Sequence, residues 1–309
     1  MLCNLDFIAG KIIPATELPE INKKLSRIGF PNLSSELMEP YSDSSYRLWP
    51  TLNFESNVNG GNPAGDLQVG SLLLKSDPNF SQKQAVTIGA GTSLVARHVF
   101  AKGFYSGLNL SHSAHYSISS PDNIQQTNAE FCTSKQIQGW DFFDICIDSV
   151  STKKTLSSNS VKNNWIQFAS YYTGKENSIV SSKVKLGTED GIYLYDKIKY
   201  SYGLTFREGS GSLMEFGLKS SNSNTGLYGY DFNFQSDFLV RKKQYSVNFK
   251  YIDDYLGPLL GVERKDQTII GILSLPLHKR SVLSIGYSTS NSTIDYYDNE
   301  YFILNVSFR

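Results

Sequence analysis

The chain lacks most of the features that assign a protein to a class at first sight. Its 309 residues include only three cysteines and four histidines with no close Cys/His spacing, so the sequence predicts neither a disulfide scaffold nor a metal site. Lys+Arg and Asp+Glu both number 29, and a chain balanced in this way offers no polyanion-binding surface for nucleic acid. No apolar run approaches the ~20 residues that a membrane helix needs. No phosphate-binding or nucleotide-binding motif is present, so we expect no cofactor.

Aromatic residues and alternating patterns are what the sequence does contain. Aromatics make up 13% of the chain, with 19 Tyr and 18 Phe. The last nine residues alternate, and successive side chains of a strand point to opposite faces. Alternation of this kind at the C-terminus, with an aromatic closing the apolar face, is typical of the last strand of a bacterial outer-membrane barrel. The apolar face carries Phe302, Leu304, Val306 and Phe308, and the polar face carries Asn305, Ser307 and Arg309.

The same alternation recurs from Tyr46 onward. Residues 199–207, 230–240 and 245–251 each place aromatic and aliphatic side chains on one face and polar side chains on the other. The pattern predicts an all-β chain of about 14 strands, which suits membrane strands of about 9–11 residues with their connections. The expected strands cover residues 47–57, 83–96, 103–117, 125–137, 140–153, 162–175, 178–189, 194–207, 211–222, 226–241, 243–254, 264–277, 280–290 and 299–309.

The expected connections are of two kinds, and the two kinds alternate along the chain. Outer-membrane barrels have short periplasmic turns and longer outer loops. We therefore expect a transmembrane antiparallel up-and-down β-barrel in the bacterial outer membrane. The alternative is a soluble β-sandwich or barrel, which would bury the aromatic face and expose the charges. The short connections are residues 207–211, 240–244 and 277–281, and the longer ones are 117–126, 154–164, 187–196, 220–228, 253–267 and 289–300.

The first 45 residues differ in character from the rest. Residues 46–309 form the predicted barrel, and residues 1–45 are expected to be a short periplasmic extension. Apolar residues recur at near-helical spacing within residues 19–30, which favours a short amphipathic helix; a disordered leader is the alternative. The first residues have no basic stretch and no uninterrupted apolar stretch, so no signal peptide is predicted there. Either the start is missing or the chain begins part-way through a larger protein.

The position of the charges decides which face of each strand points outward. A charged side chain on the lipid face costs roughly 2–4 kcal/mol at the bilayer midplane, so the charged face is expected to line the lumen. The face bearing Tyr200, Phe232, Phe249 and Leu304 is then expected to point outward. About 14 strands enclose more space than side chains readily fill, which predicts a passage. The expected lumen-lining residues are Lys183, Lys185, Lys199, Arg207, Glu215, Lys219, Asp231, Asp237 and Lys250.

The first and last strands are expected to pair and close the barrel. An unpaired backbone edge in hydrocarbon costs several kcal/mol per group, so closure is required. Pro50 lies in the first of these strands and removes one ladder donor, which predicts a weakened seam that opens sideways. The expected seam residues are Pro50, Leu52, Leu304, Val306 and Phe308.

Two of the three cysteines fall in neighbouring strands. Cys132 and Cys146 lie on either side of a turn centred near Gly139, opposite each other and both on the lumenal face. A cross-strand disulfide is compatible with this register and with the oxidising envelope. A register shift of one residue would separate the two thiols.

The only histidine cluster is residues 111–115, Ser-His-Ser-Ala-His. Ser111 and Ser113 share the lumenal face with His115, at separations of roughly 13 and 7 Å along one strand. These separations are too long for a hydrogen bond between a nucleophile and its base. Asp144 and Asp148 are lumenal carboxylates on another strand, and lumen polarity accounts for them. We therefore predict that the chain is not an enzyme.

Three stretches carry a resemblance to a known family. They are Asn57-Val58-Asn59-Gly60-Gly61 after the first strand, Gly89-Ala90-Gly91-Thr92-Ser93-Leu94 in the second, and Gly286-Tyr287-Ser288 with residues 291–297 before the last. Through their order and spacing, residues 46–309 resemble the C-terminal barrel of the surface lipoprotein assembly modifier family, called Slam. Ile303 and Arg309 depart from the usual terminal signal of outer-membrane barrels, in which a small residue is frequent and the aromatic comes last. The first-loop residues that the resemblance singles out are Asn57, Asn59, Gly60 and Gly61.

The resemblance implies a translocon that moves lipoproteins, or related secreted protein cargo, across the outer membrane to the cell surface. It also implies a periplasmic helical-repeat domain, for which residues 1–45 are too few. The expected partners are outer-membrane lipid, the barrel assembly machinery, the exported cargo and periplasmic chaperones. The alternative function is a porin or specific small-solute channel, with a constriction formed by residues 65–75 folding inward. A third function is an adhesive barrel whose Ser/Asn-rich loops bind a ligand outside the cell.

Overall fold

The computed structural model describes most of the chain from Tyr41 to Phe308. The predicted amphipathic helix of residues 19–30 and the lumenal candidate Arg207 lie outside the described residues. The described residues are 41–63, 66–69, 72–100, 104–138, 141–173, 178–191, 193–206, 210–221, 226–241, 243–259, 261–278 and 281–308.

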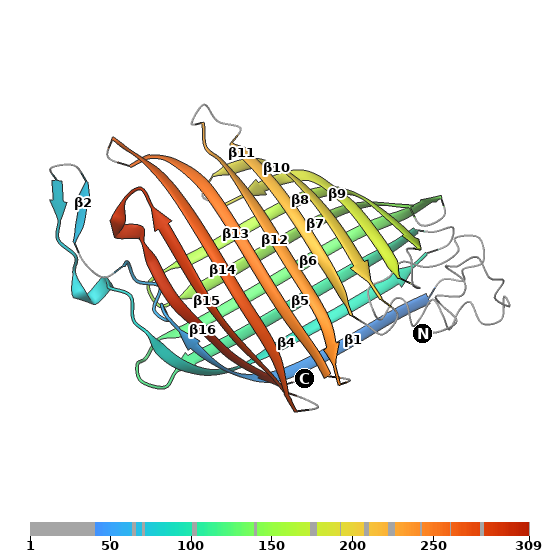
Figure 1. The fold of residues 1–309 in the computed structure, drawn as a ribbon, viewed down its shortest axis with the longest axis horizontal. Coiled ribbons are helices and arrows are strands. Elements are labelled where there is room, and N and C mark those ends of the chain that lie inside the picture. Colours follow the sequence, from blue (N-terminus) through green and yellow to red (C-terminus); the bar gives the residue numbers. More distant parts are fainter. Residues whose placement is uncertain are drawn as a thin grey trace.

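Fourteen strands form a closed antiparallel barrel (Figure 1). Each barrel strand pairs with its neighbours along the chain, and β1 pairs with β16 to close the barrel. The fold prediction is confirmed in its strand number and in its up-and-down order. The barrel strands are β1 (Tyr41–Glu55), β4 (Ala85–Val99), β5 (Phe104–Ser117), β6 (Asn123–Gln138), β7 (Asp141–Lys154), β8 (Ser158–Thr173), β9 (Ile179–Asp190), β10 (Leu194–Thr205), β11 (Gly211–Ser221), β12 (Tyr228–Val240), β13 (Lys243–Leu259), β14 (Val262–His278), β15 (Ser281–Ser292) and β16 (Asn299–Phe308).

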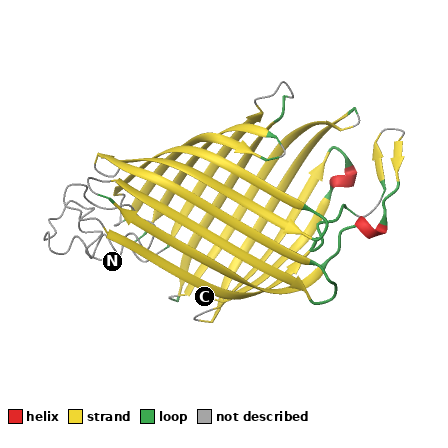
Figure 2. Ribbon diagram, turned by 180° about the vertical axis from the view of Figure 1, so that it is seen from behind, coloured by secondary structure: helices red, strands yellow, loops and turns green. Residues whose placement is uncertain are grey.

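In the part of the chain that the structure describes, a small hairpin and two single-turn 3-10 helices lie outside the barrel wall. In the connection between β1 and β4, β2 (Leu67–Val69) pairs with β3 (Leu72–Leu74), and η1 (Pro78–Phe80) follows them. The second helix, η3 (Asp295–Tyr297), lies between β15 and β16. Figure 2 shows both helices at one end of the barrel, which we call the loop end. The opposite end, where β1 begins and β16 ends, is the turn end.

Strand boundaries at the loop end differ from the expectation. Residues 253–267, predicted to form a long polar loop, are mostly paired parts of β13 and β14, which are joined through residues 260–261. Residues 154–164 likewise form a tight turn of residues 155–157 and the start of β8. The long-loop prediction is wrong at both places. A strand that continues beyond the membrane still pairs its backbone but no longer needs an apolar face, so its composition imitates a loop. β1 also begins early, at Tyr41.

The outer surface of the barrel is apolar. Every barrel strand exposes at least one large apolar side chain, and the exposed fraction reaches 68% for both Tyr46 and Phe302. Tyr200, Phe249 and Leu304, predicted to point outward, are exposed to 45%, 38% and 45%. A soluble barrel would bury such side chains, whereas a continuous apolar surface around a closed barrel is a lipid-facing surface. The chain is therefore a β-barrel of the bacterial outer membrane. Within the described residues, no helix is long and apolar enough to span a membrane.

Two tryptophans of the inward face lie over glycines of the neighbouring strand. A Cβ atom on Gly91 would lie 2.4 Å from Cε2 of Trp49, and one on Gly187 would lie 2.8 Å from Cε3 of Trp165. Glycine weakens a strand interior because it has no side chain to pack. A large ring over each glycine supplies the missing contact at these two points of the wall.

Candidate functional site: the lumen, its mouth and the seam

One face of the strands converges on an internal hollow. A cavity of about 310 Å³ is lined from six consecutive barrel strands, β4 to β9, by residues that include Arg97, Tyr105, Glu130, Asp144 and Lys183. Consecutive strands of a closed barrel meet in one space only on the concave side, so this face lines the lumen. Most exposed apolar side chains of these strands occupy the alternate positions, and Val95, which lines the cavity, is an exception.

The predicted lumenal side chains lie on this inward face. The register links them from strand to strand, because Lys199 lies opposite Lys185, and Ser201 lies opposite both Lys183 and Glu215. The described members of the predicted set are Lys183 and Lys185 on β9, Lys199 on β10, Glu215 and Lys219 on β11, Asp231 and Asp237 on β12, and Lys250 on β13.

Several lumenal charges are paired between neighbouring parts of the wall. Lys199 Nζ lies 3.3 Å from Glu215 Oε2, and Asn233 Nδ2 donates a hydrogen bond of 3.1 Å to the same oxygen. Lys219 Nζ lies 2.8 Å from Asp254 Oδ1. These pairs make the lumen polar while keeping its net charge small. Sequence reasoning missed Asp254, because it fell within the predicted loop.

Lys183 and Lys185 differ from the paired lysines. Their ammonium groups lie over aromatic rings, 5.7 Å from the ring centroid of Tyr171 and 6.0 Å from that of Trp165. Among the described residues, neither lysine forms an ion pair with a carboxylate. Cation–π contacts hold an ammonium group in place without adding a counter-charge. Glu130 and Glu215 attract the Lys185 ammonium group but form no ion pair with it. Trp165 and Tyr171 were missed from sequence, although the alternation along β8 places both on the lumenal face.

Residues 57–62, which we call the mouth segment, run from the end of β1 across the loop end of the barrel. The carbonyl oxygen of Asn59 accepts a 2.7 Å hydrogen bond from Leu156 N, and that of Asn57 accepts a 2.6 Å bond from Lys154 Nζ. Both donors belong to the end of β7 and the following turn, and β7 is the fourth strand round the barrel from β1. The segment therefore spans the rim above three intervening strands.

Buried side chains hold the mouth segment from below. Val58 is fully buried and clusters with Ala85 of β4 and Ile124 of β6. The side chain of Asn59 donates to the carbonyl oxygen of Ser81 at 2.8 Å and accepts from Lys83 N at 2.9 Å. The segment is thus attached to its own returning chain as well as to the β7–β8 turn.

The two glycines of the first-loop motif are required by this path. Gly60 has a φ of +73°, and a Cβ atom there would lie 2.0 Å from Ser157 Oγ. A Cβ atom on Gly61 would lie 2.6 Å from the carbonyl oxygen of Phe80. Left-handed backbone and backbone contacts this close both call for glycine. The four residues singled out in the sequence, Asn57, Asn59, Gly60 and Gly61, thus form one docked unit.

The β2–β3 hairpin extends away from the barrel at the loop end (Figure 1). The inward-folding constriction predicted for residues 65–75 is therefore wrong for the described part of that stretch. Asn62 N donates to Phe80 O at 2.8 Å, and Gln82 N donates to Asn62 O at 2.7 Å. These bonds close the base of the hairpin beside the mouth segment and direct its tip outward.

Cys132 and Cys146 form a disulfide between β6 and β7. They lie directly opposite each other in the register, and their Cα atoms are 4.1 Å apart. Cys132 also lines the internal cavity, which places the bond on the lumenal face. The disulfide therefore fastens this hairpin from the inside.

The seam between β1 and β16 is the shortest strand pairing in the barrel. It joins residues 51–54 to residues 304–307 in four pairs, whereas all other neighbouring barrel strands share ten or more pairs among the described residues. The predicted seam residues Leu52, Leu304 and Val306 lie within the four pairs, and Pro50 and Phe308 lie one position outside them.

A hydrogen-bond network braces the seam on its lumenal side. Asn305 Nδ2 donates to Asn53 Oδ1 across the seam, and Asn53 Nδ2 lies 3.1 Å from His115 Nδ1. Thr51 Oγ1 lies 3.1 Å from the same ring nitrogen. His115 belongs to β5 and crosses β4 at Gly89, where a Cβ atom would lie 2.9 Å from its Nδ1. The histidine weighed from sequence as a base thus links β5 to β1 and, through Asn53, to β16.

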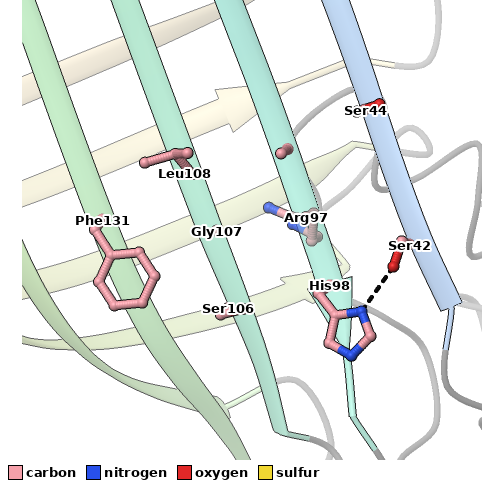
Figure 3. Close-up of a pocket in the computed structure, with 9 residues that line it drawn as sticks. Ser42, Ser44, Arg97, His98, Ser106, Gly107, Leu108 and Phe131 are labelled. Carbon is pink, nitrogen blue, oxygen red and sulfur yellow. Dashed lines mark hydrogen bonds between the residues drawn. The ribbon is translucent and has the colours of Figure 1, made fainter.

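A serine–histidine contact lies on the outer face at the turn end. Ser42 Oγ lies 2.7 Å from His98 Nδ1, beside a pocket of about 230 Å³ also lined by Ser106 and Phe131 (Figure 3). A catalytic base needs a third group that orients it, and no carboxylate of the described residues bonds to His98. No group of three His, Cys, Asp or Glu in the described part of the chain is placed to hold a metal ion. That the chain is not an enzyme stays a prediction.

Comparisons with known proteins assign no family. No family model matches the chain, and no curated protein matches it. Among solved structures, the chain is similar to a BenF-like porin from Pseudomonas fluorescens Pf-5 (9% identity, TM-score 0.43, covering 86% of this chain and 98% of that one). It is also similar to Pseudomonas aeruginosa OpdQ (9%, 0.43, 86% and 97%) and to Pseudomonas aeruginosa OccK2 (OpdF) in complex with glucuronate (10%, 0.39, 86% and 95%). At these TM-scores the similarities carry no functional argument, and the Slam resemblance stays a prediction.

Proposed function

We propose that the protein is a channel for small polar solutes across the bacterial outer membrane. The observation that carries this proposal is a closed barrel with an apolar exterior and a hollow lined by charged and amide side chains. The exterior is stable in lipid. A solute that loses bound water on entering the lumen finds polar side chains there that replace the lost hydrogen bonds. Of the functions predicted from the sequence, the small-solute channel needs only these two features.

Lys183 and Lys185 give the lumen its preference among solutes. Their charges are uncompensated by any ion pair of the described residues, whereas Lys199 and Lys219 are neutralised by neighbouring carboxylates. A small anion passing β9 therefore meets an attractive potential, which raises its local concentration relative to a cation. The ring faces of Trp165 and Tyr171 keep both ammonium groups against the wall.

Planar-bilayer recording of the purified, folded protein tests the proposal. We expect stepwise ion conductance with a preference for chloride over potassium. Lys183→Gln/Lys185→Gln should reduce that preference while the conductance persists. Lys135→Gln is the matched control. Lys135 contacts the outward-facing ring of Phe104, so this substitution removes a positive charge without changing the lumen. A folded barrel that inserts into the bilayer and carries no current would rule out the channel.

The short seam favours a second candidate, a Slam-type translocon for lipid-anchored or secreted proteins. A cargo with a membrane anchor has to leave a barrel sideways, and only four residue pairs would have to separate at the β1–β16 seam. The test is to delete the gene and treat intact cells with protease. Lipoproteins that become protease-protected at unchanged total amounts support the translocon. An unchanged surface profile rules out the translocon and favours the channel.

A further inference from the structure

Isoleucines gather on the lumenal wall next to the seam. On the inward face of β13, β14 and β16 lie Ile252, Ile270, Ile272 and Ile303, each partly exposed, which we call the apolar track. Solvent-facing apolar patches on a largely polar wall mark binding sites for apolar groups. A passage for polar solutes alone gives no reason for four isoleucines in one region of its wall.

Between β14 and β16 the apolar track is continuous because a glycine lies within it. Gly286 of β15 lies opposite Ile272 on one side and opposite Ile303 on the other. No side chain stands between the two isoleucines, and a Cβ atom on Gly286 would lie 3.0 Å from Ile272 Cγ1. The track therefore extends from β13 to β16, the last strand before the seam.

The track ends beside an open backbone edge. β16 pairs with β1 only through residues 304–307, so residues 299–303 have no strand partner on that side among the described residues. β1 offers one further strand residue, Glu55, which pairs with Ala85 of β4 but not with β16, and the chain then continues into the mouth segment. Ile303 lies on the lumenal side of this edge, while Phe302 and Leu304 are exposed on the lipid side. Apolar side chains thus flank the wall on both sides where its pairing stops.

We propose that this part of the seam is a lateral passage for an alkyl chain between the lumen and the membrane. The chain lies on the apolar track and moves past residues 299–303 into the lipid, while its polar head group stays in the lumen. The passage widens when the four seam pairs separate, and the Asn305–Asn53–His115 hydrogen bonds oppose that separation. The inference rests on the proposed channel, because the head group travels through the same lumen. The alkyl chain belongs to a free amphiphile whose polar head group is small enough for this lumen.

Cross-linking the seam tests the passage. In a Cys3→Ser background, Asn53→Cys/Asn305→Cys joins β1 to β16 at a described pair. The matched control Ser284→Cys/Asn305→Cys joins β15 to β16, which share ten pairs and have no part in the proposed opening. Each variant is expressed in cells in its folded, oxidised form. The cells are then incubated with a probe that has a dodecyl chain and a fluorescent polar head group. Potassium chloride conductance of each purified variant is measured in parallel.

Uptake of the dodecyl probe should be several-fold faster in cells with the wild-type or control protein than in cells without it. The seam cross-link should reduce uptake to the background rate and leave conductance unchanged. Ile270→Ser/Ile272→Ser, which keeps the seam free, should slow uptake as well. Surface display of a triacylated lipoprotein is measured in the same cells. If the seam cross-link abolishes this display and leaves probe uptake unchanged, the alkyl chain is that of a protein anchor.

Two results separate the inference from the proposed function. If seam-cross-linked cells take up the probe and display the lipoprotein as the wild type does, the lateral passage is refuted, whatever the conductance. If no variant conducts ions while cross-linking still stops uptake, the ion channel is refuted and the lateral passage stands.

Discussion

Gly60→Ala is the most specific perturbation of the mouth segment. An alanine in left-handed backbone, here a φ of +73°, costs about 1–2 kcal/mol because its Cβ approaches the following carbonyl oxygen. The same Cβ would lie 2.0 Å from Ser157 Oγ and 2.9 Å from Lys154 Cβ. The β7–β8 turn has to move to relieve these contacts, which breaks the 2.7 Å hydrogen bond from Leu156 N to Asn59 O. The loss of one such bond contributes about 1 kcal/mol more.

The two effects together weaken docking of the mouth segment by about 2–3 kcal/mol, which is roughly a 30- to 150-fold shift toward the undocked state. Single-channel recording detects the change, because a segment that leaves the rim alters the current through the lumen. We expect Gly60→Ala to show more frequent current fluctuations than the wild type. Its barrel should remain folded, since the strand pairing is untouched, and heat-modifiable gel mobility checks this.

Two variants make the test decisive. Gly226→Ala is the matched control, because Gly226 has a φ of +64° but a Cβ atom there would have no neighbouring heavy atom within 4 Å. It carries the backbone cost without a steric clash and should leave the current steady. Adding Ser157→Gly to Gly60→Ala removes the nearest clash and should restore part of the docking. Current traces of Gly60→Ala that match those of the wild type would refute the reasoning.

Three further outcomes follow from the lumen, the disulfide and the exterior. Lys183→Glu/Lys185→Glu changes the lumenal charge by four units. For an ion that passes at about one Debye length from these side chains, the change should shift the potassium-to-chloride permeability ratio about tenfold toward potassium. The reversal potential measures this ratio. Reduction of Cys132–Cys146, a 14-residue separation, should lower the free energy of unfolding by about 2–3 kcal/mol, measured by urea titration. Leu304→Lys places a charge in lipid. Near the bilayer midplane this charge should destabilise the folded barrel by roughly 2–4 kcal/mol, which the same urea titration measures.

The alternation of side chains was sufficient to predict the strands that cross the membrane. In β10 and β12 the lipid imposes one apolar face and the lumen one polar face, so the period of two is visible in the sequence. The prediction failed at residues 253–267, because outside the lipid both faces of β13 and β14 are polar. It failed for residues 65–75 for a different reason, since hydrogen bonds from the mouth segment orient that hairpin and no local pattern encodes them.

The candidate site was predictable in its residue types but not in its partners. Strand parity placed Lys183 and Lys185 on the lumenal face, yet the rings beneath them belong to another strand. His115 was weighed against serines of its own strand and against carboxylates of another strand, but not against residues of the first strand. Its hydrogen-bond partners Thr51 and Asn53 lie 64 and 62 positions away in the chain. Contacts at such separations depend on the stagger between strands, which periodicity does not report.

The sequence by itself determined that this protein is a 14-stranded barrel with an apolar outside and a charged inside, because each strand carries that division within its own residues. Only the tertiary structure decided how the barrel closes. The stagger of neighbouring strands accumulates around the whole circumference, so the meeting of residues 51–54 with 304–307 depends on every pairing in between. For that reason the short seam, the open edge of β16 and the mouth segment above β4 to β6 are properties of the closed barrel.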